Sequence, residues 1–136
     1  MSRAPIIVLL LFFSLNGCGL GSLSGSCENS ARKILSSPNG ERKAVIFERG
    51  CGATVGAITG ISVLPAELQL DNDASGNVLL ADAAFQQEGE EVNFDVEWHS
   101  NTKLVVRYTQ STFLRTNLEA EGVAIKFEEI KHWYEH

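Results

Sequence analysis

The chain has 136 residues, of which 17 are acidic and 11 are basic, so its formal net charge is −6, and 44% of its residues are hydrophobic. This length suits one domain with one core. An acidic surface repels nucleic acid and anionic lipid headgroups, so we expect no nucleic-acid partner and no attachment to a membrane through basic charge.

The first residues have the composition of an export signal. Arg3 is followed by an apolar run over 5–13 and then by the sequence LNGC, which ends at Cys18. A helix needs about 20 apolar residues to cross a bilayer, so a secretory signal is favoured over a membrane span. Leu15 and Gly17 before Cys18 resemble a bacterial lipobox, whose cysteine is lipidated, with palmitate, and becomes the new amino terminus. An ordinary signal that is cut further along is the alternative.

These assignments divide the chain into a lipoprotein signal peptide over 1–17, a lipidated anchor with a flexible tether over 18–26, and a single β domain over 27–136. The tether reads GLGSLSGS, and eight such residues span about 16 Å on average. Gly19 stands where an aspartate would resemble an inner-membrane retention signal. We therefore expect a bacterial cell-envelope protein, held in the outer membrane and facing the periplasm if the cell has two membranes.

Two cysteines remain once Cys18 is assigned to the anchor. Cys27 and Cys51 form an even pair in a chain that meets an oxidising compartment, so we expect a disulfide bond between them. Closing a loop of roughly 25 residues would restrain the unfolded chain by about 3 to 3.5 kcal/mol. The alternative makes Cys51 a nucleophile served by His99, but nothing in the local sequence activates its thiol.

The segment from Ser37 to Gly40 predicts a tight turn. Proline pre-sets the first corner, asparagine tolerates the second, and glycine accepts the left-handed exit. The run ENSARKIL before it is ambiguous between strand and helix, but the turn favours the first arm of a β-hairpin. The second arm is apolar on both faces, as a central strand is, with Ala44 and Ile46 on one face and Val45 and Phe47 on the other.

The run CGATVGAITGISVLP, from Cys51 onward, carries no charge and has glycines four residues apart. We interpret it as a glycine loop that leads into a strand over 59–64 and forms a candidate binding loop. The same spacing is typical of packed membrane helices, so a membrane-interacting segment is the alternative. A phosphate cradle is excluded because no Lys-Ser/Thr ending and no helix follow. The candidate binding residues are Gly52, Ala53, Thr54, Gly56 and Gly60.

The sequence DNDASG begins another turn at Asp71. Its oxygen-bearing side chains match the first, third and fifth places of an EF-hand loop, its glycine matches the sixth, and Asp82 falls at the twelfth. An aspartate at the last place and a strand-like run over 77–81 favour a solvated turn without metal. Calcium binding by Asp71, Asp73, Ser75 and Asp82 stays open.

The tail ends with His132 and His136, whose spacing of four would suit a metal on a helix. The chain end favours a frayed or packed tail, although metal binding by these histidines also stays open. Taken together, we predict no cofactor and no resident metal.

The second half predicts two paired strands and a last one. Over 92–99 apolar and polar residues alternate, so one face is buried and the other wet. A turn at 100–102 leads to a strand over 103–109, whose Lys103 and Arg107 can meet the acids of its neighbour. A polar connection over 110–121 precedes the last strand, over 123–128. The inward residues are Val92, Phe94, Val96, Trp98, Leu104, Val106, Tyr108, Val123, Ile125 and Phe127, and the wet residues are Asn93, Asp95, Glu97 and His99.

The stretch SPNGERKAVIFERGCGAT resembles a segment of small bacterial exported proteins, often lipoproteins, whose function is uncharacterised. The shared pattern is Ser-Pro-Asp/Asn-Gly, Lys-Ala-Val, an aromatic residue, Arg, and Cys-Gly-Ala-Thr. The matching residues are Ser37, Pro38, Asn39, Gly40, Lys43, Ala44, Val45, Phe47, Arg49, Cys51, Gly52, Ala53 and Thr54. The resemblance implies an exported protein and supplies no catalytic residue.

The whole pattern predicts an all-β domain, a small antiparallel sandwich or half-open barrel of about seven strands. We expect a non-enzymatic binding or accessory module that is attached to the membrane through its lipid, with an envelope protein as a possible partner. One alternative is a small envelope hydrolase that uses His99 with Asp95 and Glu97. The other is a protein whose glycine loop interacts with the membrane.

Overall fold

The computed structural model describes residues 27–52, 58–82, 94–109 and 112–131. The signal, Cys18 and the tether lie outside these ranges, as do Ala53, Thr54 and Gly56, Val92 and Asn93, and the two tail histidines. The described strands are β1 (Glu28–Ser36), β2 (Arg42–Gly50), β3 (Ile58–Pro65), β4 (Leu79–Asp82), β5 (Phe94–Ser100), β6 (Lys103–Tyr108), β7 (Thr112–Thr116), β8 (Glu119–Ala120) and β9 (Val123–Glu129). No helix that could cross a membrane occurs in the described ranges.

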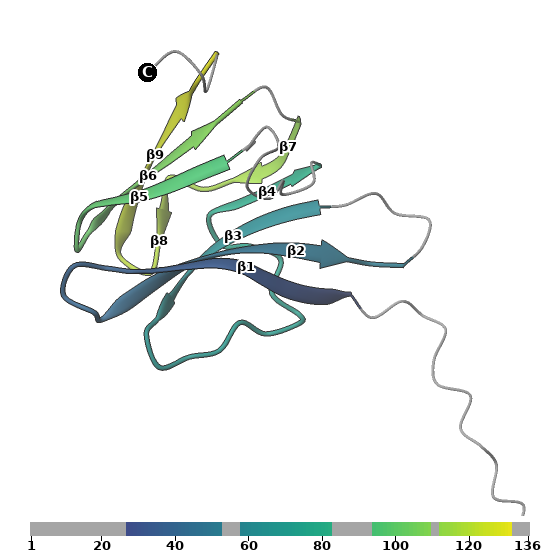
Figure 1. Cartoon of the computed structure of the whole chain (residues 1–136), viewed down its shortest axis with the longest axis horizontal. Helices are drawn as coiled ribbons and strands as arrows, with labels where there is room; N and C mark the ends of the chain where they lie inside the picture. Colours follow the sequence, from purple (N-terminus) through teal and green to yellow (C-terminus); the bar gives the residue numbers. More distant parts are fainter. Residues whose placement is uncertain (1–26, 53–57, 83–93, 110–111, 132–136) are drawn as a thin grey trace, which may run out of the picture.

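The strands form two sheets that pack face to face (Figure 1). The first sheet has the order β1-β2-β3-β4-β7, and the second has the order β5-β6-β9-β8. The predicted all-β class is confirmed, and the architecture is a sandwich without barrel closure. The described residues form nine strands, whereas the sequence predicted about seven, because the segment predicted to be a polar connection contains β7 and β8.

Phe113 explains why residues 112–116 form strand β7. It pairs with Ala81 of β4 and packs its ring against Tyr108, with the ring centroids 4.7 Å apart. A single apolar residue facing the core is enough to hold a short strand whose other side chains are polar or exposed. The predicted polar connection over 110–121 therefore contains two short strands that the sequence did not predict, at 112–116 and 119–120.

The pairing of β6 with β9 is parallel, whereas every other described pair is antiparallel. Lys103 lies opposite Ala124, and the register runs without a shift to Tyr108 opposite Glu129. Parallel neighbours need a long connection. Here that connection leaves β6, pairs with the first sheet as β7, and returns as β8, so it links the two layers on one side of the sandwich.

The predicted hairpin is present. Ser37 N donates to Arg42 O at 2.8 Å, Gly40 N donates to Ser37 O at 2.9 Å, and Gly40 has a φ of +73°. Asn39 N also donates to the side-chain oxygen of Asn101 at 2.8 Å, so this turn is bonded to the turn between β5 and β6.

Both faces of β2 are buried, as its apolar composition predicts. Ala44 and Ile46 point into the core between the sheets. Val45 and Phe47 lie on the other face of the first sheet, which we call the outer face, and they are also fully buried. We name residues 66–77, which connect β3 to β4, the strap. Figure 1 shows the strap on the side of the first sheet that is turned away from the second sheet.

Side-chain contacts join β1 of the first sheet to β5 of the second sheet along one side of the sandwich. Trp98 Nε1 of β5 donates to Leu35 O of β1 at 3.0 Å, and Lys33 Nζ of β1 lies 3.6 Å from Asp95 Oδ1 of β5. Both strands are sheet edges, so these contacts join two edges that have no backbone hydrogen bond between them.

Candidate functional site

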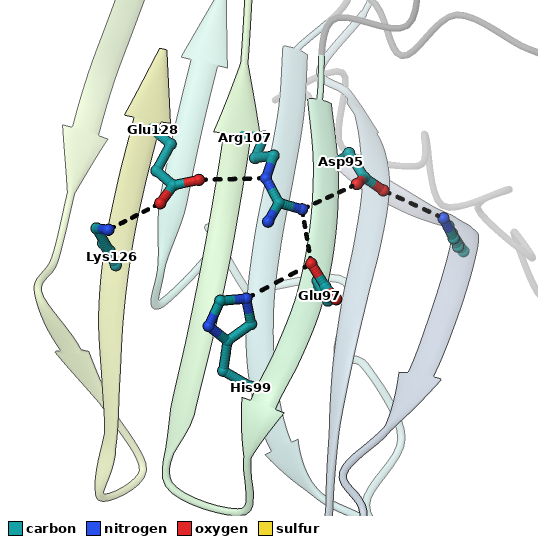
Figure 2. A network of polar contacts seen from close by, with 7 residues as sticks. Asp95, Glu97, His99, Arg107, Lys126 and Glu128 are labelled. Atoms are coloured by element: carbon teal, nitrogen blue, oxygen red, sulfur yellow. Dashed lines mark hydrogen bonds and ion pairs between the residues drawn. The ribbon is translucent and has the colours of Figure 1, made fainter. Parts of the chain in front are cut away.

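The wet face of the second sheet carries a network of ion pairs centred on Arg107 (Figure 2). Its Nη1 lies 2.7 Å from Glu97 Oε2 and 3.7 Å from Asp95 Oδ2, and its Nε lies 3.2 Å from Glu128 Oε2. The prediction that Arg107 meets the acids of the neighbouring strand is confirmed. Among the described residues, Lys103 has no ion-pair partner.

Further side chains on β1, β5 and β9 extend this network. Lys126 Nζ lies 2.8 Å from Glu128 Oε1, Lys33 pairs with Asp95, and His99 Nε2 lies 3.5 Å from Glu97 Oε2. Three cations and three carboxylates therefore alternate across β1, β5, β6 and β9. We call these six residues and His99 the polar face.

Three residues of the polar face have pKa values shifted toward their charged forms. A hydrogen bond from Arg107 is the largest cause that lowers the pKa of Glu97, and a hydrogen bond from Lys126 is the largest that lowers the pKa of Glu128. Reciprocally, Glu97 raises the pKa of Arg107. Carboxylates stabilised in this way accept hydrogen bonds and do not donate protons near pH 7.

The predicted hydrolase residues, Asp95, Glu97 and His99, do lie side by side. However, the side chain of His99 is 41% exposed on a strand face, and Glu97 is shared between His99 and Arg107. A general base needs a proton to abstract within hydrogen-bond reach and a site that holds the substrate. Charge pairing accounts for all three residues.

The other candidate region is the end of the sandwich where β1 begins and β2 finishes. The sulfur atoms of Cys27 and Cys51 are bonded at 2.14 Å, which confirms the predicted disulfide. The sulfur of Cys51 is therefore not a free nucleophile. Gly52 follows directly, with a φ of +114° and an exposed surface.

Only part of the candidate binding loop can be placed. Gly60 lies inside β3 opposite Phe47, where it is buried. A Cβ on this residue would overlap three atoms of the Phe47 ring. Gly60 is therefore a packing residue and does not belong to an accessible loop. Gly52 is the described residue of the candidate loop, while Ala53, Thr54 and Gly56 lie outside the described residues.

The calcium-like sequence forms the tip of the strap. Asp71 Oδ1 accepts from Asp73 N at 3.0 Å, and Asp71 O accepts from Ala74 N at 3.1 Å, which is the geometry of a self-bonded turn. Asp82 lies in β4, and no cluster of three or more metal-ligating residues occurs in the part of the chain that the structure describes. These contacts favour the turn over a calcium loop.

Asn29 and Arg49 are the residues that the sequence reading missed. Arg49 Nη1 donates to Asn72 O at 2.9 Å and to Ala74 O at 2.7 Å, and Asn29 Nδ2 donates to Asp71 O at 2.8 Å. They bond the tip of the strap to β1 and β2. The available signal was Arg49, which belongs to the predicted motif between Ser37 and Thr54.

Fold and surface together define a class: a two-layer β-sandwich with one disulfide, one ion-paired face and one strapped face. Comparisons with protein-family models, with curated proteins and with solved structures find no match to this chain. The resemblance of residues 37–54 to a family of exported proteins therefore stays a prediction.

Proposed function

We propose that this protein is a lipid-anchored domain of the bacterial envelope that works by binding another envelope protein, as an accessory or inhibitor-like module. The observation that supports this function best is the position of the disulfide. It joins Cys27, the first residue after the proposed tether, to Cys51, the last residue before the candidate binding loop.

Because Cys27 and Cys51 are bonded at one end of the sandwich, the proposed tether and the candidate loop would leave the described strands at the same end. A tether of eight residues spans about 16 Å, so the loop would face a partner close to the membrane surface. A loop that is bonded at its base loses less conformational entropy on binding than a free one does. The proposal therefore assigns contact with the partner to the loop that begins at Gly52.

The hydrolase and membrane-loop alternatives have weaker support. The acids beside His99 are engaged by Arg107, which leaves a charge-balanced surface on flat strands. A membrane-interacting loop would share the same position near the anchor, but residues 52–57, which are glycine, alanine and threonine apart from Val55, bury little apolar area. Each alternative has a direct test.

The anchor is tested with the Cys18→Ser variant. We expect the wild-type protein to remain in the membrane fraction and to incorporate palmitate, and the variant to appear in the soluble envelope fraction. A variant that stays bound to membranes at high salt would instead favour the membrane-interacting loop. Wild-type protein that takes up no lipid would contradict the anchor.

The partner surface is tested by cross-linking in intact envelopes. We compare Thr54→Lys, in the candidate loop, with Glu67→Lys, an exposed change near the opposite end, where Ala66 N donates to Glu41 O at 3.0 Å. Loss of a specific cross-linked protein with Thr54→Lys alone supports the proposal. Equal cross-linking by both variants would show that the binding surface lies outside the candidate loop.

The hydrolase alternative is tested by assays on cell-wall and ester substrates. A binding module gives equal background rates for wild type and for His99→Ala. A rate that falls at least about a hundredfold in the variant, as expected when a general base is removed, would establish the enzyme instead.

A further inference from the structure

An apolar strip on the outer face of the first sheet is buried, and the strap lies on that side of the sheet (Figure 1). Val45 is 1% exposed and Phe47 is 0% exposed, although both lie on the outer face, away from the core between the sheets. Of the segments that the structure describes, the strap is the one on this side of the first sheet (Figure 1). It is irregular and carries no strand of its own. Its position therefore depends on the contacts at its ends and at its tip.

The end of the strap next to β4 is held firmly. Asn77 Oδ1 accepts from Val63 N, and Asn77 Nδ2 donates to Val63 O, both at 2.8 Å, so one side chain continues the ladder along β3. Arg115 Nη2 donates to Ser75 O, also at 2.8 Å. These bonds attach residues 75–77 to β3 and β7.

The tip of the strap is bonded to β1 through Asn29 and to β2 through Arg49, whose Nη1 donates to Asn72 O and Ala74 O. Asn29 N donates to Asn72 Oδ1 at 3.0 Å, and Asn29 Nδ2 donates to Ala74 O at 2.7 Å as well as to Asp71 O. Asn29 Oδ1 also accepts from Arg49 Nη1 at 2.9 Å, which orients the guanidinium toward the same carbonyls. With a longer bond from Asn29 Nδ2 to Asn72 O at 3.4 Å, four hydrogen bonds at the tip start from one residue of β1.

Asn29 belongs to the first half of β1. β1 is an edge strand, and a register shift between Ala31 and Lys33 separates its first four residues from the rest. The second half is held by Leu35, which packs on the core and bonds to Trp98. The first half pairs with β2 alone, and the disulfide lies at its end, two residues from Asn29.

We propose that the Cys27–Cys51 bond is a redox-sensitive latch on the strap. A dithiol reductant opens it by two exchanges: one thiolate forms a mixed disulfide with one sulfur, and the second thiol then displaces that sulfur. The products are two protein thiols and a disulfide in the reductant. The first half of β1 then separates from β2, and Asn29 leaves the tip. Arg49 thereby loses the side-chain oxygen that orients its guanidinium, so its two hydrogen bonds to the strap no longer hold the tip and the strap uncovers Val45 and Phe47. Both cysteines are partly exposed, so a reductant can reach them.

The test is limited cleavage by a protease that cuts after acidic residues, because the strap contains Glu67, Asp71 and Asp73. On the protein purified from envelopes, we expect a dithiol to raise the cleavage rate at these sites at least about tenfold, as local opening does. The amides of Val105 and Val106 in β6 should keep their protection from hydrogen exchange. Unchanged cleavage would overturn the latch, and so would equal loss of protection in β6, since the bond would then stabilise the whole fold.

Matched variants separate the latch from the tip contact. Asn29→Ala, with the disulfide intact, should raise strap cleavage without reductant, whereas Ser30→Ala, an exposed neighbour, should not. The double variant Cys27→Ser/Cys51→Ser should be cleaved as fast as the reduced wild type and should not respond to the dithiol. A double variant that is cleaved as slowly as the oxidised protein would contradict the proposal.

Discussion

At the scale of single residues, Gly60 and Phe47 form a pair whose members cannot change independently. They face each other across β2 and β3, and the ring occupies the space that a Cβ of residue 60 would need. Phe47 is fully buried, so its ring cannot swing into solvent to make room. Glycine at this position is a packing requirement.

Gly60→Ala is therefore expected to lower the free energy of unfolding by about 1–3 kcal/mol, the usual cost of overpacking. Denaturant titration measures the change. Gly50→Ala is the control, since the nearest atom to its Cβ would be Glu28 O at 4.0 Å. Phe47→Leu combined with Gly60→Ala should recover part of the loss, because a smaller side chain frees the space. Equal stability of Gly60→Ala and wild type would contradict the close approach.

The turn between β8 and β9 carries the one described non-glycine residue with a positive φ, Glu121 at +51°, followed by Gly122 at +73°. Ala120 pairs with Val123, so these two residues form a two-residue hairpin loop. Both central residues of such a type I′ loop need a left-handed conformation, which asparagine adopts more readily than glutamate.

We expect Glu121→Asn to raise the free energy of unfolding by about 0.5–1 kcal/mol, because it relieves left-handed strain at this residue. Thermal or denaturant unfolding measures the gain. Glu119→Asn, on the neighbouring strand, removes the same charge without relieving strain and should give no gain. A decrease for Glu121→Asn would mean that its side chain makes a stabilising contact.

At the scale of elements, the polar face joins four strands of two sheets through Arg107 and Lys33. Arg107 holds the pKa of Glu97 below its ordinary value of 4.5, which an unfolded chain would restore. Glu97 therefore contributes stability above the unfolded pKa, and that contribution is lost as the pH falls through the lower, folded pKa.

Arg107→Gln should accordingly be less stable than wild type at pH 7, and the difference should shrink below about pH 4.5 as the carboxylates become protonated. Denaturant midpoints at both pH values, in low salt, measure the effect, since salt screens exposed pairs. Lys103→Gln changes an exposed cation of the same strand, without a described ion-pair partner, and should show no such pH dependence. A stability difference that is the same at both pH values would show that Arg107 stabilises the fold through packing.

At the scale of the whole molecule, one core joins the two sheets. Phe94 of β5 is 1% exposed, and its ring centroid lies 6.5 Å from that of Phe113 of β7. The connection through β7 and β8 also crosses between the layers. Because the sheets share their core and their chain, neither should unfold alone.

We expect Phe94→Ala to lower the free energy of unfolding by about 3–5 kcal/mol through loss of burial and cavity formation. Far-UV circular dichroism and tryptophan fluorescence, to which Trp98 contributes, should follow one coincident transition. Leu114→Ala, at a side chain that is 55% exposed, should cost about 0.5 kcal/mol or less. Separate transitions for the two signals would show that the sheets are independent.

The residues of the motif between Ser37 and Thr54 have structural roles at this scale. Ser37, Asn39 and Gly40 form the turn, Val45 and Phe47 lie on the strapped face, and Arg49 bonds the strap. Cys51 closes the disulfide. Each of these residues stabilises the fold, so the motif describes an architecture and supplies no catalytic group.

Local chemistry in the sequence was enough to predict the all-β class, the hairpin at Ser37–Gly40, the buried and wet faces of β5 and β6, and the cysteine pair. Turn residues act over four positions, and side chains alternate between the faces of a strand, so neither signal needs knowledge of distant contacts. The same alternation predicted that Arg107 would meet Asp95 and Glu97.

The tertiary structure alone decided the parallel pairing of β6 with β9, the strand at β7, and the bonds from Asn29 to a strap more than forty residues away. It also showed that Gly60 lies in β3 rather than in the candidate loop, and that Asp82 lies in β4. These features depend on which surfaces meet once the chain has collapsed, and a glycine, an asparagine or an arginine carries no local signal of its distant partner. Local periodicity specifies elements, whereas the energy of packing them selects their neighbours.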